Sequence, residues 1–330
     1  MKSLSAQPVL AKLAVTAALS VLVPFFVGAG QPAAATSDGD HGTRLQVHSA
    51  AMNKDVTVDV QRAADTSRPA PTLYLLNGAG GGEDAATWEQ QTDALRFLAD
   101  KNVNVVVPVG GKFSYYTDWR AEDPELGVNK WQTFLTQELP PVINRMLGAN
   151  GVNAIAGLSA SATSVLQLPI SAPGLYRAVA SYSGCAQISD RIGNAFVKTV
   201  VAAGGGVASN MYGPADDPMW AANDPYVHAD QLRGLNLYIS SGTGIPGQYD
   251  TLNDPRINGK LMTLIDQDIL GGTIEAAVNW CTHNMATRLD QLGIPATVNY
   301  EPTGTHSWGY WQDELKRSWP VLAAGLGLPS

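Results

Sequence analysis

The sequence predicts an α/β fold with a mostly parallel sheet of about eight strands and helices on both faces. Short β-rich runs alternate along the chain with longer runs in which apolar residues recur every three or four positions. Five of the β-rich runs are apolar almost throughout, which is typical of strands covered on both faces. No shift in composition divides the chain after its N-terminal segment, so we expect residues 36–330 to form one domain.

The strands are expected in a fixed order. Two runs of alternating apolar and polar residues come first, as in half-buried or edge strands, and one alternating run comes last. The five apolar strands lie between them. The expected ranges are 44–49, 55–60, 72–77, 103–109, 152–156, 178–183, 235–240 and 296–301.

Helices are expected between these strands, where the apolar spacing changes to three and four residues. Residues 190–233 are rich in Gly, Asn, Asp and Pro, and we expect a long connection there with some helix. Long connections in compact domains are often functional. The expected helices cover 85–100, 130–147, 160–170, 275–292 and 308–326.

The first 35 residues differ from the rest. They carry two lysines as their only charges, then an apolar stretch, then small residues with A-x-A spacing that end at Ala35. This pattern predicts a signal peptide at 1–35, cleaved after Ala35, and therefore a secreted or cell-envelope protein. The alternative is an uncleaved membrane anchor, but the stretch is barely long enough and Pro24 interrupts it.

The charge composition argues against a nucleic-acid partner. The net charge is -8 and no basic run exists, so nucleic acid is not expected as a partner.

The two cysteines, Cys185 and Cys281, lie in the exported part, where they form either one disulfide or two buried thiols. The sequence has no C-x-x-C motif or His/Cys cluster, so we expect no metal and no cofactor.

Ser159 lies in the segment GLSAS (157–161), between an apolar strand and a predicted helix. A serine in such a strand–turn–helix context is typical of a nucleophile elbow, in which the flanking residues must be small. Ser161 stands where glycine is usual, and we interpret it as a small spacer. The pentapeptide alone is equally compatible with a turn that has no chemistry.

A nucleophilic serine needs a histidine base and an acid, in the chain order Ser, acid, His. His306 lies in the loop between the last strand and the last helix, where this base belongs. The other four histidines precede the sheet core, precede a strand directly, or lie within a predicted helix. The pattern does not select the acid. The candidates before His306 are Asp250, Asp254, Asp266, Asp268 and Glu275.

A glycine-rich loop, LLNGAGGG (75–82), follows an early strand. Its backbone can approach a substrate closely, and one N–H of an oxyanion hole is expected from such a loop. The second N–H is expected from Ala160, the residue after the serine. The alternatives are a flexible turn or a phosphate loop, although a phosphate loop would end in Gly-Lys-Ser/Thr.

Five segments, spread over about 240 residues, resemble the mycolyltransferases of the antigen 85 complex and their corynebacterial relatives, which are esterase D-like α/β-hydrolases. The resemblance implies an α/β-hydrolase fold and transfer of a mycolyl group from trehalose monomycolate to a second trehalose monomycolate or to arabinogalactan. The matching segments are LYLLNG (73–78), VVVPVGGKFSYYTDW (105–119), KWQTFLTQELPPVI (130–143), AGLSASATSVLQL (156–168) and GTHSWGYWQDEL (304–315).

For the site, the resemblance implies a triad in which Ser159 is the nucleophile, Glu275 the acid and His306 the base. It also implies that the backbone N–H groups of Ala79 and Ala160 form the oxyanion hole. The acyl group would pass to Ser159 with release of trehalose, and a sugar hydroxyl would then take it from the serine.

Substrate contacts are implied for Asn77, Gly80 and Trp308. Antigen 85 has a trehalose-binding Asp and Arg where this chain has Asn77 and Gly80, and the loss of both charges favours the corynebacterial branch, with another acceptor. The family disulfide has no counterpart here. We expect Cys185 to pair with Cys281 and to hold the acid-bearing helix against the sheet.

Two other functions remain open at this point. A secreted serine esterase would use the same residues with water as the acceptor, and a non-catalytic binding protein can share the fold. The partners implied by the leading hypothesis are trehalose mycolates, cell-wall arabinogalactan and, through peripheral contact, the mycomembrane.

Overall fold

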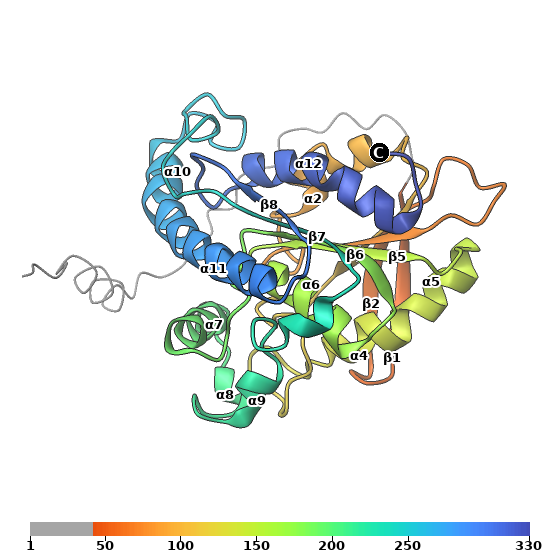
Figure 1. The fold of residues 1–330 in the computed structure, drawn as a ribbon, viewed down its shortest axis with the longest axis horizontal. Coiled ribbons are helices and arrows are strands. Elements are labelled where there is room, and N and C mark those ends of the chain that lie inside the picture. The colour runs from red at the N-terminus through yellow and green to blue at the C-terminus, as the bar shows by residue number, and fades with distance from the viewer. Residues whose placement is uncertain (1–41) are drawn as a thin grey trace, which may run out of the picture.

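The computed structural model describes residues 42–330, in which a central sheet is covered by helices on both faces (Figure 1). The signal peptide expected at 1–35 lies outside the described residues. Within residues 42–330, no helix has both the length and the apolar character needed to cross a membrane.

The sheet has eight strands in the order β1-β2-β4-β3-β5-β6-β7-β8. β2 pairs antiparallel with β1 and β4, and all other neighbours are parallel. This confirms the predicted mostly parallel α/β sheet. The strands are β1 Gly42–Ser49, β2 Lys54–Gln61, β3 Thr72–Leu76, β4 Asn104–Val109, β5 Asn153–Leu158, β6 Tyr176–Tyr182, β7 Asn236–Ser241 and β8 Thr297–Tyr300.

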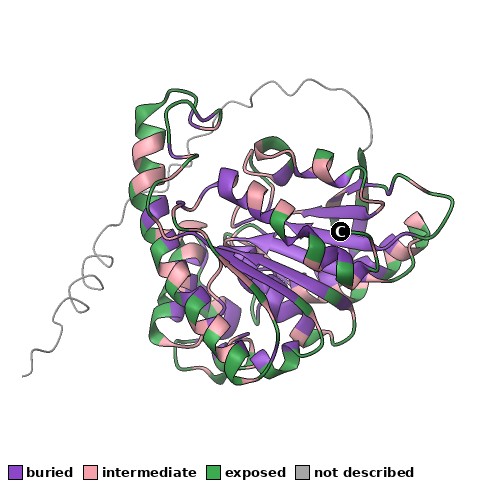
Figure 2. Ribbon diagram, turned by 45° about the horizontal axis from the view of Figure 1, so that its top comes forward, coloured by how far each residue is buried: buried purple, intermediate pink, exposed green. Residues whose placement is uncertain are grey.

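The central strands are buried on both faces because successive side chains point to opposite sides of the sheet (Figure 2). On β3, Tyr74 and Leu76 belong to one apolar cluster, whereas Leu73 and Leu75 belong to the other. The alternation explains why these strands are apolar at every position.

Two groups of helices form the outer layers. One face packs against α2 (Trp88–Gln91), α3 (Ala94–Leu98) and α12 (Trp308–Leu326). The other face packs against α5 (Leu139–Leu147), α6 (Ala160–Ser171) and α11 (Gly272–Gln291). Figure 1 shows α12 and α6 on opposite sides of the strands.

The structure corrects several helix boundaries. The helix expected at 85–100 is two short helices, α2 and α3. The helix expected at 130–147 contains α4 (Trp131–Thr133), the π-helix η2 (Phe134–Glu138) and then α5. Two prolines in the first turn of α5 lack the N–H groups that an unbroken α-helical ladder would use.

A helical segment that the sequence analysis did not identify precedes α11. It consists of α10 (Leu261–Asp266) and the π-helix η4 (Gln267–Gly271), and α11 follows without a break. The long connection also contains helix, as expected. Its elements are α7 Arg191–Ala203, α8 Ala208–Tyr212, α9 Pro218–Ala222 and the 3-10 helix η3 Ala229–Leu232.

Candidate active site

Ser159 lies at the turn between β5 and α6, at the carboxyl end of a central strand. Its φ of 56° and ψ of -125° place a non-glycine residue in a rarely populated region. A side chain at Gly157 would not fit, because its Cβ would lie 2.6 Å from the Oγ of Ser161. The turn is therefore tight, as a nucleophile elbow requires.

Ser161 does more than fill a small space. Its fully buried Oγ accepts a hydrogen bond from the N–H of Leu158 and lies within donating distance of the Leu158 carbonyl, both at 2.9 Å. These bonds cross the elbow and support the residue that precedes Ser159. Glycine, the usual residue at this position, could not form them.

Ser159, His306 and Glu275 form a continuous hydrogen-bonded chain. Nε2 of His306 lies 2.8 Å from Oγ of Ser159, and Nδ1 of His306 lies 2.7 Å from Oε2 of Glu275. The Glu275 side chain is 1% exposed and the His306 side chain 11%. This is the geometry in which an imidazole can take a proton from a serine while a buried carboxylate fixes its tautomer.

The second oxygen of Glu275 is held by two donors. Oε1 accepts hydrogen bonds from the Oγ of Ser183 and from the backbone N–H of Gly242, each at 2.7 Å. A buried carboxylate needs such donors, since its burial without them is costly. The donors come from the ends of β6 and β7, so the sheet itself orients the acid.

Ser183 is a residue of this site that the sequence analysis missed. It follows β6 with a φ of 54°, and its Oγ also accepts a hydrogen bond from Nε1 of Trp311 at 2.9 Å. The Trp311 ring in turn packs edge-to-face against His306, with ring centroids 4.9 Å apart. Ser183 thus contacts the acid, and Trp311 contacts the base. No sequence motif marks Ser183, whereas Trp311 lies within the matching segment 304–315.

The two residues expected to supply the oxyanion donors are Ala79, in the loop after β3, and Ala160, at the start of α6. Among residues 42–330, the backbone N–H groups of Ala79 and Ala160 donate no hydrogen bond within the protein. Ala160 begins α6, whose N-terminal dipole favours negative charge at this point. The Ala79 loop is fixed by a hydrogen bond of 2.6 Å from the N–H of Phe113 to the Ala79 carbonyl.

The Asn77 side chain is not presented to a substrate. It is 1% exposed, and its Oδ1 accepts a hydrogen bond from the N–H of Trp88. This placement contradicts the substrate contact expected for the Asn77 side chain, which instead supports the start of α2. Gly80 faces Asp84, because a Cβ at Gly80 would lie 2.5 Å from a carboxylate oxygen of Asp84.

Trp308 is the first residue of α12 and is partly buried. Its ring packs edge-to-face against Trp88 and Trp311, with centroids 5.6 and 5.2 Å apart. Trp311 contacts His306, so this aromatic cluster borders the triad. Trp308 is therefore linked to His306 through the ring of Trp311.

Cys185 and Cys281 are joined by a disulfide, the pairing expected from the sequence. Cys185 follows β6, two residues after Ser183, and Cys281 lies in α11, six residues after Glu275. The disulfide therefore connects the helix that carries the acid to the strand end that orients it.

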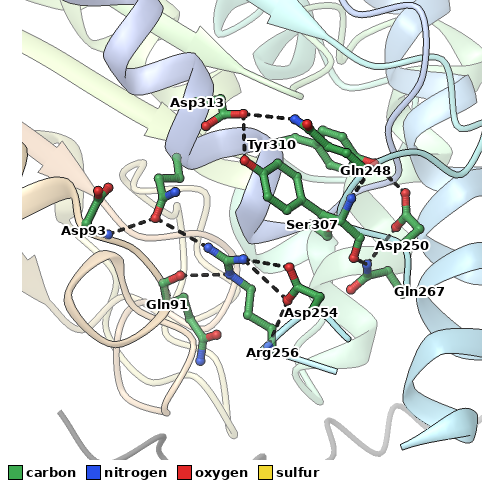
Figure 3. A network of polar contacts seen from close by, with 12 residues as sticks. Gln91, Asp93, Gln248, Asp250, Asp254, Arg256, Gln267, Ser307, Tyr310 and Asp313 are labelled. Carbon is green, nitrogen blue, oxygen red and sulfur yellow. Dashed lines mark hydrogen bonds and ion pairs between the residues drawn. The ribbon is translucent and has the colours of Figure 1, made fainter. Parts of the chain in front are cut away.

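The other carboxylates before His306 have different surroundings (Figure 3). Asp250 accepts hydrogen bonds from Thr305, Tyr310 and Gln267, and it thereby ties η4 to the loop of His306 and to α12. The remaining acids do not bond to the base. Asp254 pairs with Arg256, and Asp266 and Asp268 lie on α10 and η4.

Comparisons with known proteins identify the family of this chain. The family model described as "Putative esterase" matches residues 49–321. The chain is 32% identical over 329 residues to the "Diacylglycerol acyltransferase/mycolyltransferase Ag85B" of Mycobacterium avium, covering 96% of this chain and 94% of the relative. It is 33% identical over 292 residues to the protein named Ag85A of Mycobacterium leprae, covering 86% and 83%.

Solved structures show the same fold. MPT51 (FbpC1) of Mycobacterium tuberculosis superposes with a TM-score of 0.72 at 23% identity, over 87% of this chain and all of that one. An S-formylglutathione hydrolase from Agrobacterium tumefaciens has a TM-score of 0.65 at 14% identity, over 89% and 99%. The chain therefore belongs to the esterase family of α/β-hydrolases and, within it, to the mycolyltransferases of the Ag85 type.

Proposed function

We propose that this protein is an exported acyltransferase that moves a mycolyl group from trehalose monomycolate to a second trehalose monomycolate or to arabinogalactan. The observation that carries the proposal is the hydrogen-bonded chain of Ser159, His306 and Glu275 in a member of a family whose relatives are named mycolyltransferases. The same chain of residues favours an enzyme over a non-catalytic binding protein.

Acylation begins when the Oγ of Ser159 attacks the ester carbonyl of the donor. Nε2 of His306 takes the serine proton, and Glu275 stabilises the resulting imidazolium through Nδ1. The oxyanion lies against the N–H groups of Ala79 and Ala160. When the carbon–oxygen bond to trehalose breaks, His306 returns the proton to the departing sugar oxygen.

Transfer repeats these steps in reverse with a new hydroxyl. His306 takes the proton of an acceptor sugar hydroxyl, whose oxygen attacks the acyl-enzyme, and Ser159 leaves with the proton from His306. Water in place of the sugar would give hydrolysis instead. The outcome therefore depends on which hydroxyl reaches the acyl-enzyme first.

Sugar recognition by this chain differs from a site built on an Asp and an Arg in the oxyanion loop. Asn77 is buried, and Gly80 has no side chain to offer. We propose that the partly buried Trp308, whose ring packs against Trp311, contacts the sugar.

The proposal is tested by incubating the protein without residues 1–35 with trehalose monomycolate and identifying products by mass spectrometry. Trehalose dimycolate in excess over free mycolic acid supports transfer. Free mycolic acid alone would assign the protein as an esterase, and no product at all would favour a binding protein. Ser159→Ala serves as the control and should form neither product.

A further inference from the structure

Residues 110–116, which directly follow β4, lie along the loop that is expected to supply the first oxyanion donor. We call them the 110–116 segment. The N–H of Phe113 donates to the carbonyl of Ala79 at 2.6 Å, and the N–H of Gly110 donates to the carbonyl of Gly81 at 2.8 Å. A Cβ at Gly81 would lie 2.6 Å from the carbonyl oxygen of Gly110, so the two backbones are in direct contact. The segment therefore holds the residue whose N–H would face the oxyanion.

The 110–116 segment has an unfavourable backbone conformation. Phe113, Tyr115 and Tyr116 have φ angles of 56°, 55° and 47°, so three of four successive residues are left-handed although each carries a Cβ. Such a conformation persists only where the surrounding structure holds it. Loss of a holding contact should let the segment relax, and Ala79 would then shift with the segment to which it is bonded.

One holding contact lies within the segment. Ser114 is fully buried, and its Oγ donates to the carbonyl of Gly111 at 2.6 Å. The same Oγ accepts a hydrogen bond from the N–H of Tyr116 at 3.1 Å. These bonds fix the local turn, and they do not connect the segment to another element.

The connection to another element is made by Ser164 of α6, the helix that begins at Ala160. Ser164 is 2% exposed, and its Oγ lies 2.6 Å from the carbonyl oxygen of Tyr115 and 3.3 Å from that of Ala160. A hydroxyl has one proton to donate, so we assign the hydrogen bond to the nearer carbonyl, that of Tyr115. Within residues 42–330, the Tyr115 carbonyl accepts no hydrogen bond from any other group.

Ser164 thus joins the two halves of the expected oxyanion hole. It lies one helical turn after Ala160, the second donor, and its hydroxyl holds Tyr115. Two residues before Tyr115, the N–H of Phe113 holds Ala79, the first donor. An oxyanion hole acts only if both N–H groups come within about 2.7–3.1 Å of one oxygen, so the spacing between the two donors matters for the rate.

We propose that Ser164 is a positioning residue of the reaction, which sets the place of the Ala79 N–H relative to the Ala160 N–H through the 110–116 segment. Ser164 touches no reacting atom, and its effect passes through its hydrogen bond to Tyr115. This inference rests on the proposed acyl-transfer function and adds to it a residue that shapes the oxyanion hole.

The test compares Ser164→Ala with wild type on a soluble short-chain nitrophenyl ester. The variant leaves the Tyr115 carbonyl without its donor, and we expect kcat/KM to fall by about tenfold to hundredfold. The Ki of a trifluoromethyl ketone with the same acyl chain should rise by the same factor, because its adduct with Ser159 carries the oxyanion. The Ki of the matching methyl ketone, which binds as an unreacted carbonyl, should not change.

The pH dependence of kcat/KM separates this role from a displaced base. It should be the same in Ser164→Ala and in wild type, because His306 and its partner Glu275 keep their contacts. A shifted pH profile would overturn the proposal, since movement of the triad would then explain the loss. Equal weakening of both ketones would also overturn it, because a distorted acyl site would then be the cause.

Ser318→Ala is the matched control for loss of a buried hydroxyl. Ser318 is fully buried in α12, and its Oγ donates to the carbonyl of Leu315 at 2.8 Å. The control should keep wild-type kcat/KM and both wild-type Ki values. A loss of kcat/KM in Ser318→Ala equal to that in Ser164→Ala would overturn the proposal, as would wild-type kinetics in Ser164→Ala.

A second variant decides the matter if Ser164→Ala does not fold. Ser114→Ala loosens the 110–116 segment from within, and it should raise the Ki of the trifluoromethyl ketone while leaving that of the methyl ketone unchanged. An unchanged Ki for both ketones would then overturn the proposal. Failure of wild type to react with a fluorophosphonate would refute the proposed function, whereas a reactive wild type beside an unimpaired Ser164→Ala would refute only the role of Ser164.

Discussion

The Oγ of Ser183 lies 2.7 Å from Oε1 of Glu275, the carboxylate oxygen that does not face His306. Ser183 thereby orients the carboxylate of Glu275 on the side away from His306. Trp311 donates a hydrogen bond to the same Oγ of Ser183, and its ring contacts the ring of His306. The precision of the triad is set by these supporting contacts as much as by the three residues themselves.

Replacing Ser183 by alanine should lower kcat for a soluble ester by about tenfold to hundredfold, because Glu275 loses a donor and its orientation loosens. Ser183→Gly separates this effect from backbone strain, since glycine tolerates the positive φ at this position. Both variants should lose similar activity, while only Ser183→Ala keeps the strain. Wild-type kcat in either variant would show that the hydroxyl does not position the acid.

Ser161 should contribute to stability through its hydrogen bonds, and not only by being small enough for the elbow. Ser161→Ala leaves the buried N–H of Leu158 without the acceptor that it has in the structure, which costs about 1–3 kcal/mol of unfolding free energy. Ser161→Gly should cost at least as much. Denaturant titration measures the difference, and an unchanged midpoint in both variants would contradict this role.

The disulfide between Cys185 and Cys281 should stabilise the acid-bearing helix. Its loop is long, with a sequence separation of 96, and Cys185→Ser/Cys281→Ser is expected to lower the unfolding free energy by about 2–5 kcal/mol. Thiol titration of the denatured, unreduced protein should find no reactive thiol. Two reactive thiols would show that the pair is not formed.

Asp268 gives a prediction about pH. Burial, and secondarily the charge of Asp250, raises the pKa of the Asp268 carboxyl above its usual value. The folded state therefore binds this proton more tightly than the unfolded state, so stability falls as the pH rises from the unfolded pKa through the raised folded pKa. Asp268→Asn should have a higher Tm than wild type at neutral pH.

The same substitution supplies its own control at acid pH. Below the unfolded pKa of Asp268 the carboxyl is protonated in both states, and the advantage of Asp268→Asn should disappear there. Melting curves across the acid range measure this difference. A constant difference in Tm at every pH would mean that the charge of Asp268 is not the cause.

The sequence predicted the sheet well because apolar runs bounded by polar turns are a strong signal, and all eight strands lie near their expected places. The expected helix at 308–326 also matches α12, which ends at Gly327 in the left-handed conformation. The helix α10 was missed because its apolar residues do not face a core, so the pattern of a buried stripe is absent.

The site was predictable only where a motif or a chain order marks a residue. Ser159 and His306 could be proposed from the elbow and the loop, but five carboxylates were equivalent until resemblance selected Glu275. Ser183 could not be found, because its contact with Glu275 joins residues 92 positions apart. A substrate contact was predicted for the Asn77 side chain because the sequence does not show that its amide oxygen accepts a hydrogen bond from the N–H of Trp88, at the start of α2.

The central claim, that Ser159 carries the acyl group, is tested most directly by trapping the acyl-enzyme. The protein would be mixed with trehalose monomycolate, quenched in acid within the first turnover, digested, and analysed by mass spectrometry. We predict that the mycolyl mass appears on the peptide that contains Ser159 and is absent in Ser159→Ala. A mycolyl adduct on another residue, or turnover by Ser159→Ala at the wild-type rate, would contradict the account.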